Sequence, residues 1–306
     1  METTGTTRPT RRTVLALGAG TALAAALPAS STAYATGRLD DSTTRQLRAL
    51  EDKYAARLGV FARNMATGRT VRHRADERFP MCSVFKGLAA AAVLRDLDHD
   101  GEFLARRLHY TAAEVKKAGY APVTGKAENL ARGMTVGDLC AAAVGESDNA
   151  AANLLLRELG GPTAVTRFCR SAGDGITRLD RWEPELNSAE PWRRTDTTTP
   201  RAIGTTYARL VLGRALTPRD RERLTGWLVA NTTNTKRFRA GLPGWTLADK
   251  TGGGSDYGVA NDVGIGWPPH GAPLVLSVLS TTYDPEGPTH DELVAETAEL
   301  VAARLT

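Results

Sequence analysis

The stretch "MCSVFKGLAAAAVL", residues 81–94, combines a serine, a lysine and a long apolar run. Residues 87–94 carry no charged side chain, which predicts a helix that is buried on nearly all sides. Ser83 and Lys86 stand at positions i and i+3, so they share one face at the beginning of that helix. Burial favours the neutral amine of a lysine, and such an amine beside a hydroxyl can activate a serine nucleophile. The alternative interpretation is a capping serine followed by a lysine that extends into solvent.

The first 35 residues differ in composition from the rest of the chain. The pair Arg11-Arg12 precedes an apolar run over 14–27, and the small-x-small sequence "AYA" ends the segment. These features are typical of a twin-arginine export signal, although a cytosolic protein with a disordered tail is the alternative. The run is too short to span a membrane as a helix and has no cysteine, so we expect no membrane anchor. We therefore expect residues 1–35 to be removed and residues 36–306 to be secreted.

Composition and charge exclude several classes of protein. The chain has 306 residues, of which 42% are hydrophobic and 24% charged, so it can bury a sizeable core. Its formal net charge of +5 falls to +3 without residues 1–35, which hold three arginines and one glutamate. This weak positive charge argues against a nucleic-acid partner. The histidines and cysteines show no metal-ligand spacing, so we expect no metal and no cofactor, and Cys82 is expected to be a buried structural thiol.

Hydrophobic periodicity divides residues 36–306 into two strand-rich ends and a helical middle. A helix is expected over 42–58, and strands on both sides of the turn at 66–68, in 245–252, in 257–267 and in 272–281. Thr289 and Glu292 predict a capping box for a final helix. We expect a two-lobe α/β fold. The first lobe, 36–80 and 231–306, is an antiparallel sheet with terminal helices from both chain ends, and 81–230 form an inserted all-helical lobe. A site is expected in the cleft between the lobes.

Two tripeptides after the S-x-x-K sequence are further candidates for a site. The sequence S-D-N, residues 147–149, stands between two apolar helical segments, and K-T-G, residues 250–252, ends an expected strand. A helix-cap cluster and a surface turn are the alternative interpretations. Residues 180–200 form a proline-rich loop that contains Glu183 and Asn187, and Arg181 is expected to pair with Asp196 and close it. A solvated carboxylate is the alternative for Glu183.

Together these motifs mark a family. S-x-x-K, S-D-N and K-T-G in this order resemble the active-site serine β-lactamases and penicillin-binding proteins. The sequence "EPELN", residues 183–187, resembles the omega loop of class A β-lactamases, and "YAPVTGK", "GLPGW" and "DTTTP" are also similar to that family. The resemblance covers nearly the whole of 36–306. It implies a hydrolase that opens the β-lactam amide bond through an acyl-serine intermediate and confers resistance to these antibiotics. We expect a monomer, because nothing in the sequence suggests a larger assembly.

The resemblance also implies roles for particular residues. The catalytic set is Ser83 as nucleophile, Lys86 for proton transfer or charge, Ser147 as proton relay to the lactam nitrogen, Glu183 for the deacylating water, and Gly253, whose N–H forms the oxyanion hole with that of Ser83. The substrate-binding set is Tyr120 at the entrance, Asn149 for the side-chain amide, Asn187 for the water, and Lys250, Thr251 and Arg237 for the carboxylate. Arg239 is the rival of Arg237. Whether Lys86 or Glu183 is the base in acylation is open.

Departures from the family pattern leave two rival functions. Ser255 is one residue extra after K-T-G, and Ala90 stands where many relatives have a cysteine that pairs with the Cys140 position. Glu146, directly before Ser147, is unexplained. The first rival is a penicillin-binding D-Ala-D-Ala carboxypeptidase or transpeptidase, and the second is a β-lactam sensor or cell-wall binding module that is acylated and then stops. Glu183 argues against both, because it supplies the base that a trapped acyl-enzyme lacks.

Overall fold

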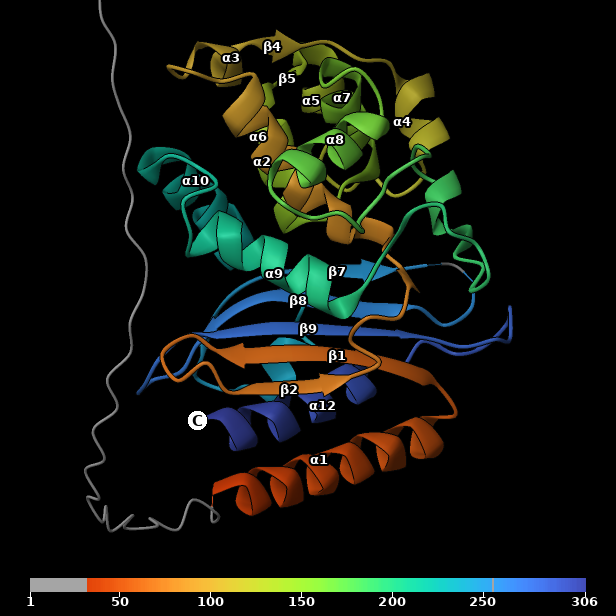
Figure 1. Cartoon of the computed structure of the whole chain (residues 1–306). Helices are drawn as coiled ribbons and strands as arrows, with labels where there is room; N and C mark the ends of the chain where they lie inside the picture. Colours follow the sequence, from red (N-terminus) through yellow and green to blue (C-terminus); the bar gives the residue numbers. More distant parts are fainter. Residues whose placement is uncertain (1–31, 255) are drawn as a thin grey trace, which may run out of the picture. The chain divides into compact units, whose positions relative to one another are not determined.

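The computed structural model of the protein describes residues 32–254 and 256–306 (Figure 1). Most of the expected export signal and the extra Ser255 lie outside these described residues. Helix α1 (Thr32–Tyr54) begins ten residues before the expected position 42 and includes the end of the expected signal. In the ranges 32–254 and 256–306, no helix combines the length and the apolar character needed to cross a membrane.

A five-stranded antiparallel sheet forms the core of one part of residues 39–306, as predicted. Its order is β2-β1-β9-β8-β7. The strands are β1 (Arg57–Asn64), β2 (Thr70–His73), β7 (Thr246–Gly253), β8 (Ala260–Trp267) and β9 (Leu274–Thr281). Every residue of β9 is buried, because α9 (Pro200–Val211) covers one face of the sheet and α12 (Asp291–Leu305) the other (Figure 1). β7 is an edge strand, so the K-T-G sequence lies at the border of the sheet.

Helix α9 differs from the predicted lobe boundary. The sequence places it in the all-helical lobe of 81–230, but α9 packs against β1, β8 and β9. Gly204 permits this approach, since a Cβ at that position would lie 3.1 Å from the Ser277 side chain and 3.2 Å from that of Phe61. Amphipathic periodicity shows that a helix has an apolar face, but not which partner covers it.

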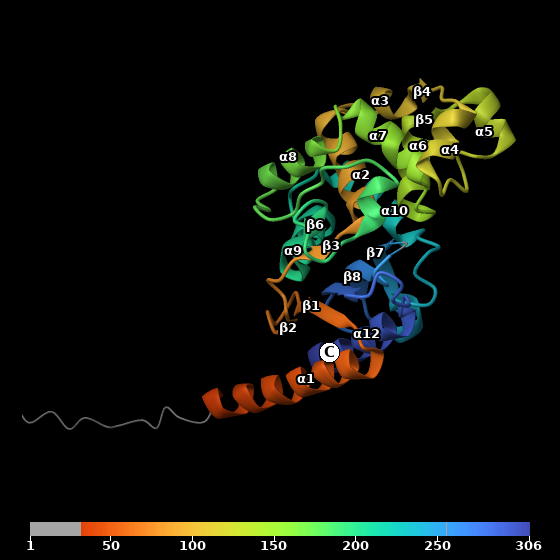
Figure 2. The ribbon, with the colours of Figure 1, turned by 90° about the vertical axis from the view of Figure 1, so that its right-hand side faces the viewer.

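Several helices pack around α2 (Phe85–Asp96), which follows the short 3₁₀ turn Cys82–Val84. All residues from Phe85 to Leu94 are buried, which confirms the predicted buried helix. Figure 2 shows α2 among its neighbours, of which α6, α7, α8 and α10 contact it. The helices not yet given bounds are α3 (Glu102–Ala105), α4 (Ala112–Ala118), α5 (Ala127–Arg132), α6 (Val136–Gly145), α7 (Asn149–Glu158), α8 (Thr163–Ser171), α10 (Pro218–Val229) and α11 (Phe238–Gly241). The short strands are β3 (Phe79–Pro80), β4 (Arg107–Leu108), β5 (Met134–Thr135) and β6 (Thr197–Thr198), and a second 3₁₀ turn spans Glu185–Ser188.

The predicted capping box at α12 is wrong. The N-cap residue is His290, one position after Thr289, and its side chain makes no capping hydrogen bond. Asp291 in the first turn instead accepts a hydrogen bond of 2.7 Å from Arg237 Nε. The helix therefore begins where this ion pair fixes it.

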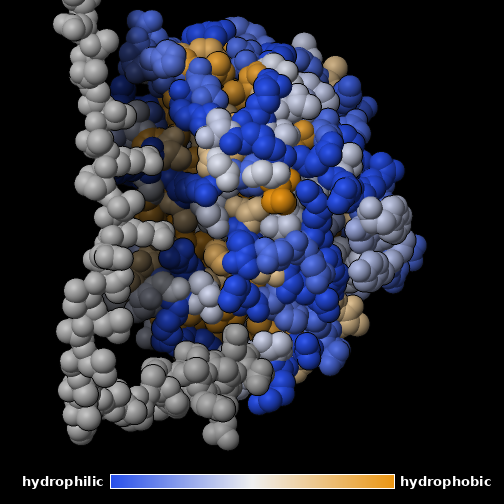
Figure 3. Space-filling model, in the orientation of Figure 1, coloured by the Kyte–Doolittle hydropathy of each residue, from blue (hydrophilic) through white to orange (hydrophobic). Residues whose placement is uncertain are grey.

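The surface in the view of Figure 3 is mainly hydrophilic, and hydrophobic residues form separate small patches on it. The large hydrophobic residues that are exposed in the described part of the chain are Met65, Tyr120, Ile176, Trp182, Trp192, Val229 and Tyr283. Cys82, Cys140 and Cys169 are buried free thiols. Burial raises the pKa of the Cys82 thiol, as expected for a structural rather than a reactive cysteine.

Candidate active site

The predicted site residues meet at one cavity of about 350 Å³. Its lining includes eight of them, namely Ser83, Tyr120, Ser147, Asn149, Asn187, Arg237, Thr251 and Gly253, together with Pro184 and Thr233. The other three, Lys86, Glu183 and Lys250, are buried directly behind this lining. A larger cavity of about 450 Å³ borders the same loop but contains only Glu183 of the predicted set. The chemistry of the side chains, rather than cavity size, therefore identifies the first cavity as the candidate site.

Ser83 lies in the 3₁₀ turn that leads into α2. The residue before it, Cys82, has a left-handed φ of 45°, a conformation that is strained for a side-chain-bearing residue. Ser83 Oγ lies 3.5 Å from Glu183 Oε1. Neither this turn nor α2 has a side-chain cap, and the side chain of Lys86 is 0% exposed. The alternative of a capping serine and a solvent-facing lysine is therefore wrong.

Lys86 is enclosed by polar partners on all sides. Its Nζ lies 3.1 Å from Glu183 Oε1 and donates to Asn149 Oδ1 at 2.6 Å and to the Ser147 carbonyl at 2.7 Å. Ser147 Oγ lies at 3.3 Å. Burial lowers the pKa of Lys86, and the negative charge of Glu183 opposes that shift. The amine can therefore exchange a proton with a carboxylate or with a hydroxyl without moving far.

Glu183 is held by both its side chain and its backbone. Asn187 Nδ2 donates to Glu183 Oε2 at 2.5 Å. Asn153 on α7 accepts from the Glu183 N–H at 3.0 Å and donates to its carbonyl at 2.9 Å. The peptide bond between Glu183 and Pro184 is cis. Sequence analysis missed Asn153, whose position in an ordinary helical pattern gives no signal of a contact 30 residues away.

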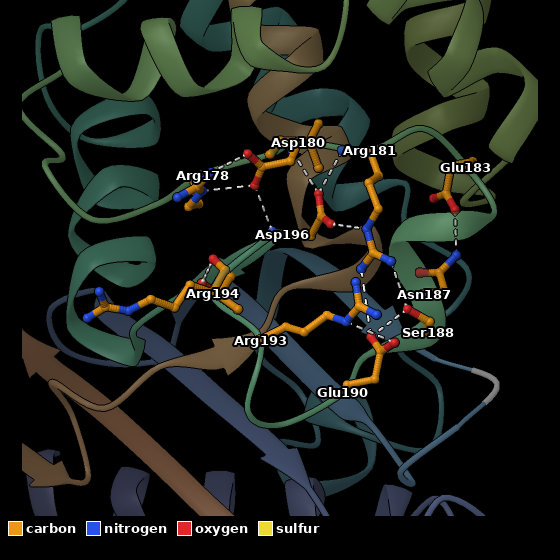
Figure 4. Close-up of polar contacts among 12 residues, drawn as sticks. Arg178, Asp180, Arg181, Glu183, Asn187, Ser188, Glu190, Arg193, Arg194 and Asp196 are labelled. Carbon is orange, nitrogen blue, oxygen red and sulfur yellow. Dashed lines mark hydrogen bonds and ion pairs between the residues drawn. The ribbon is translucent and has the colours of Figure 1, made fainter.

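The 178–196 loop, which contains Glu183, is closed at its base by Asp196 (Figure 4). Arg181 Nε donates to Asp196 Oδ2 at 2.6 Å, which confirms the predicted pair. Asp196 Oδ1 also accepts from the backbone N–H groups of Asp180 and Arg181. A buried carboxylate with these three donors fixes the two ends of the loop to one another. Within the loop, Glu190 pairs with Arg193 and accepts from Ser188 (Figure 4).

Ser147 connects the two parts of the fold. Its Oγ accepts a hydrogen bond of 3.1 Å from Lys250 Nζ, which also donates to the Thr251 carbonyl at 2.9 Å. Ser147 has a left-handed φ of 56°, so the backbone turns sharply where its hydroxyl enters the site. Burial lowers the pKa of Lys250 to about 7, and the positive charges of Lys86 and Arg237 contribute to the shift.

The residues beside Ser147 fix the entrance of the cavity. Asp148 is the N-cap of α7 and accepts from the backbone N–H groups of Val123 and Thr124. The backbone N–H of Asn149 donates to the Tyr120 carbonyl at 2.8 Å, which places the half-exposed Tyr120 ring at the rim. The Asn149 side chain accepts from Lys86 and donates to the Ala118 carbonyl at 3.0 Å. Asn149 therefore lines the cavity with one amide hydrogen still available.

Arg237, rather than Arg239, reaches the cavity. Its Nη1 donates to the carbonyls of Gly252 and Asn261 at 2.8 and 2.7 Å, and its Nε pairs with Asp291. Arg239 is outside the lining and donates to Asn234 Oδ1 at 3.1 Å.

Two further polar residues border the site. Thr233, which sequence analysis missed, shares a hydrogen bond between its Oγ1 and that of Thr251. The unexplained Glu146 accepts a hydrogen bond of 2.8 Å from Thr232 Oγ1. It therefore links the helices beside Ser147 to the segment before Thr233.

Comparison with known proteins agrees with this site. The chain matches the model of the β-lactamase enzyme family over residues 42–305. It is 68% identical to a β-lactamase of Streptomyces lavendulae over the full length of both chains. The solved β-lactamase of Streptomyces albus G is similar, with a TM-score of 0.85, 61% identity, and coverage of 87% of this chain and 100% of the other.

A third comparison is a variant of the last common ancestor of the Gram-negative class A β-lactamases. Its solved structure has a TM-score of 0.80 and 48% identity, and the match covers 86% of this chain and 97% of the other. The structure thus has the antiparallel sheet and the helical part of the predicted fold, and Ser83 and Lys86 lie close to each other beside one cavity. The chain belongs to the β-lactamase enzyme family, whose members hydrolyse the amide bond of β-lactam antibiotics.

Proposed function

We propose that this β-lactamase is an exported class A enzyme in which Ser83 is acylated and Glu183 directs hydrolysis of the acyl-enzyme. The observation that carries the proposal is the position of one carboxylate. Glu183 Oε1 is 3.5 Å from Ser83 Oγ and 3.1 Å from Lys86 Nζ, inside the loop that the class A resemblance identifies. The twin-arginine sequence supports export, and the similarity to the class A ancestor supports the class.

Acylation begins when Ser83 Oγ attacks the lactam carbonyl carbon and loses its proton. Glu183 Oε1 lies 3.5 Å from Ser83 Oγ and can accept that proton directly or through a water, and Lys86, 3.1 Å from the same carboxylate oxygen, is the alternative base. The N–H groups of Ser83 and Gly253 would stabilise the oxyanion, and the C–N bond then breaks. Ser147 would give its hydroxyl proton to the leaving nitrogen and recover one from Lys86 or Lys250, both of which contact Ser147 Oγ.

Deacylation requires a water on the side of Glu183. Asn187 donates to Glu183 Oε2, so the two side chains form a polar pair at the wall of the cavity. Glu183 would take a proton from a water held there, the hydroxide would attack the ester carbonyl, and Ser83 would leave with that proton. Lys250, Thr251 and Arg237 would bind the substrate carboxylate, because Thr251 and Arg237 line the cavity and the cation of Lys250 is buried directly behind them.

The test compares wild-type enzyme with Glu183→Ala, using a chromogenic β-lactam and intact-mass measurement of the quenched protein. We expect rapid turnover with little adduct in the wild type, and accumulation of one acyl group in the variant. Glu185→Ala is the matched control, since it removes an exposed carboxylate from the same loop. Ser83→Ala should show neither adduct nor turnover. A wild-type enzyme that takes one acyl group and stalls would instead identify a penicillin-binding protein or a sensor.

A further inference from the structure

Two aspartates that the proposed mechanism does not use are buried beside the substrate-binding wall. Asp249 on β7 is 1% exposed and Asp262 on β8 is 0% exposed. Asp262 is the sheet partner of Thr251, and Asp249 directly precedes Lys250. Neither aspartate lines the cavity. They lie on the side of β7 and β8 that faces the 231–238 connector, the segment between α10 and α11 that carries Thr233 and Arg237.

The hydrogen bonds of the two carboxyl groups are unequal. Asp249 accepts from Asn234 Nδ2 at 2.7 Å and from Asn231 Nδ2 at 3.2 Å. Asp262 Oδ2 accepts from the Phe238 N–H at 3.2 Å, whereas its Oδ1 has no N–H or O–H donor among residues 32–254 and 256–306. Asp262 pairs with Thr251, two residues after Asp249, so the two carboxyl groups lie on the same face of neighbouring strands and each shifts the pKa of the other. Two ionised carboxylates at these positions repel strongly, so one of them must hold a proton.

The surroundings decide which carboxyl group holds that proton. Burial raises the pKa of Asp249, but its two amide donors and the charge of Lys250 oppose this rise and favour the ionised form. Asp262 has one donor, and burial together with the charge of Asp249 raises its pKa well above the usual range. The other groups that face the pair are Arg237, which opposes this rise, and the buried phenol of Tyr207 on α9. Asp262 Oδ1, which has no donor among the described residues, is the oxygen on which a proton would not disturb an existing hydrogen bond.

We propose that Asp262 is a protonated positioning residue whose carboxylic acid donates to the Asp249 carboxylate and thereby anchors the 231–238 connector. The inference rests on the proposed function, because the connector matters through Thr233 and Arg237 at the substrate carboxylate. Three groups of the connector, the amides of Asn231 and Asn234 and the N–H of Phe238, donate to this one pair. Thr233 and Arg237 stand between these anchors, so the pair sets where both side chains lie.

The direct test is the ionisation of the aspartates in the intact enzyme. Carbon-13 NMR of aspartate carboxyl groups should show one group that stays protonated across the neutral range, whereas an ordinary aspartate ionises near pH 4. This signal should be missing in Asp262→Asn. Ionisation of Asp262 at an ordinary pH, or persistence of the protonated signal in Asp262→Asn, would overturn the proposal. This measurement on the wild type does not depend on whether any variant folds.

Kinetics of two matched variants provide the second test. Asp262→Asn keeps a donor toward Asp249 and an acceptor for Phe238, so kcat/KM should stay within about threefold of wild type. Asp249→Asn removes the charge and places one amide against the donors of Asn231 and Asn234. It should raise KM by about tenfold or more with a smaller change in kcat, because the carboxylate-binding wall moves. Equal losses in both variants would contradict the inference. Failure of wild-type turnover would contradict the proposed function instead.

Discussion

Two buried lysines lie on opposite sides of Ser147 and differ in the charged groups that surround them. Lys86, on α2, and Lys250, on β7, are both 0% exposed, and their Nζ atoms lie 3.3 and 3.1 Å from Ser147 Oγ. Lys86 has the Glu183 carboxylate at 3.1 Å. Lys250 has no carboxylate oxygen within 4.0 Å in the described part of the chain, and its pKa is lowered to about 7. Lys86 thus contacts a carboxylate directly, whereas Lys250 has only the more distant charges of Asp249 and Asp262 near it and can offer its positive charge to an anionic substrate.

The comparison predicts that Lys86 acts in proton transfer and Lys250 in substrate binding. Lys86→Met keeps the length of the side chain but removes the amine, and it leaves Glu183 as a buried charge without its cation. We expect kcat to fall by about a thousandfold, within the range of general acid–base effects. Stopped-flow and steady-state kinetics would measure it, with circular dichroism as a control of folding. A change confined to KM would show that the contrast between the lysines is false.

The pH profile of Lys250 is the next test. The protonated amine attracts the substrate carboxylate, and protonation dominates below a pKa of about 7. In the free enzyme, kcat/KM should therefore decline as the pH rises through that value. Lys250→Arg stays charged, so its decline should move to higher pH although kcat/KM at pH 7 falls by about tenfold. An unchanged alkaline limb in this variant would assign the titration to another group.

Arg237 and Arg239 provide a smaller test of the anion-binding side. Arg237→Ala should raise KM by about tenfold with little change in kcat, since it removes a charge from the wall near Thr251. Arg239 lies outside the cavity lining, so Arg239→Ala is the matched control and should leave KM and kcat nearly unchanged. Steady-state kinetics with one penicillin is sufficient. The reverse pattern would transfer the role to Arg239.

The smallest effect is expected at Glu146. Its contact with Thr232 joins the helical side of the site to the connector on the sheet side, but Thr232 is exposed. Glu146→Gln should therefore change kcat/KM by about twofold or less and the free energy of unfolding by about 0.5 kcal/mol. Urea denaturation and initial rates would measure both. A tenfold loss of activity would mean that this carboxylate also influences the protons of Lys86 or Lys250.

Local patterns predicted most of this architecture. Short apolar runs beside turn residues located the strands, and the spacing of Ser83 and Lys86 placed both at the beginning of a buried helix. The pair Arg181–Asp196 followed from opposite charges at the two ends of one loop, where chain closure limits the possible partners.

Long-range packing limited the prediction. Three features depend on which surfaces meet after folding. They are the packing of α9 on the sheet, the hydrogen bonds between Asn153 and Glu183, and the contact between Thr233 and Thr251. The paired carboxyl groups of Asp249 and Asp262 could not be predicted either, because each residue alone is an ordinary polar position in a strand.

The labelling rates of the three buried thiols can report local opening and unfolding of this protein. Cys82 belongs to a small hydrophobic cluster with Ala189 of the 178–196 loop, Tyr257 and Val259, whereas Cys140 and Cys169 lie in the core around α2. An alkylating reagent can reach each sulfur only after the surrounding segment detaches. The labelling rate of Cys82 would thus time the departure of the loop that carries Glu183, and the labelling of the other two would time unfolding of the helical core. One mass spectrum at successive times could separate the two events without any introduced probe.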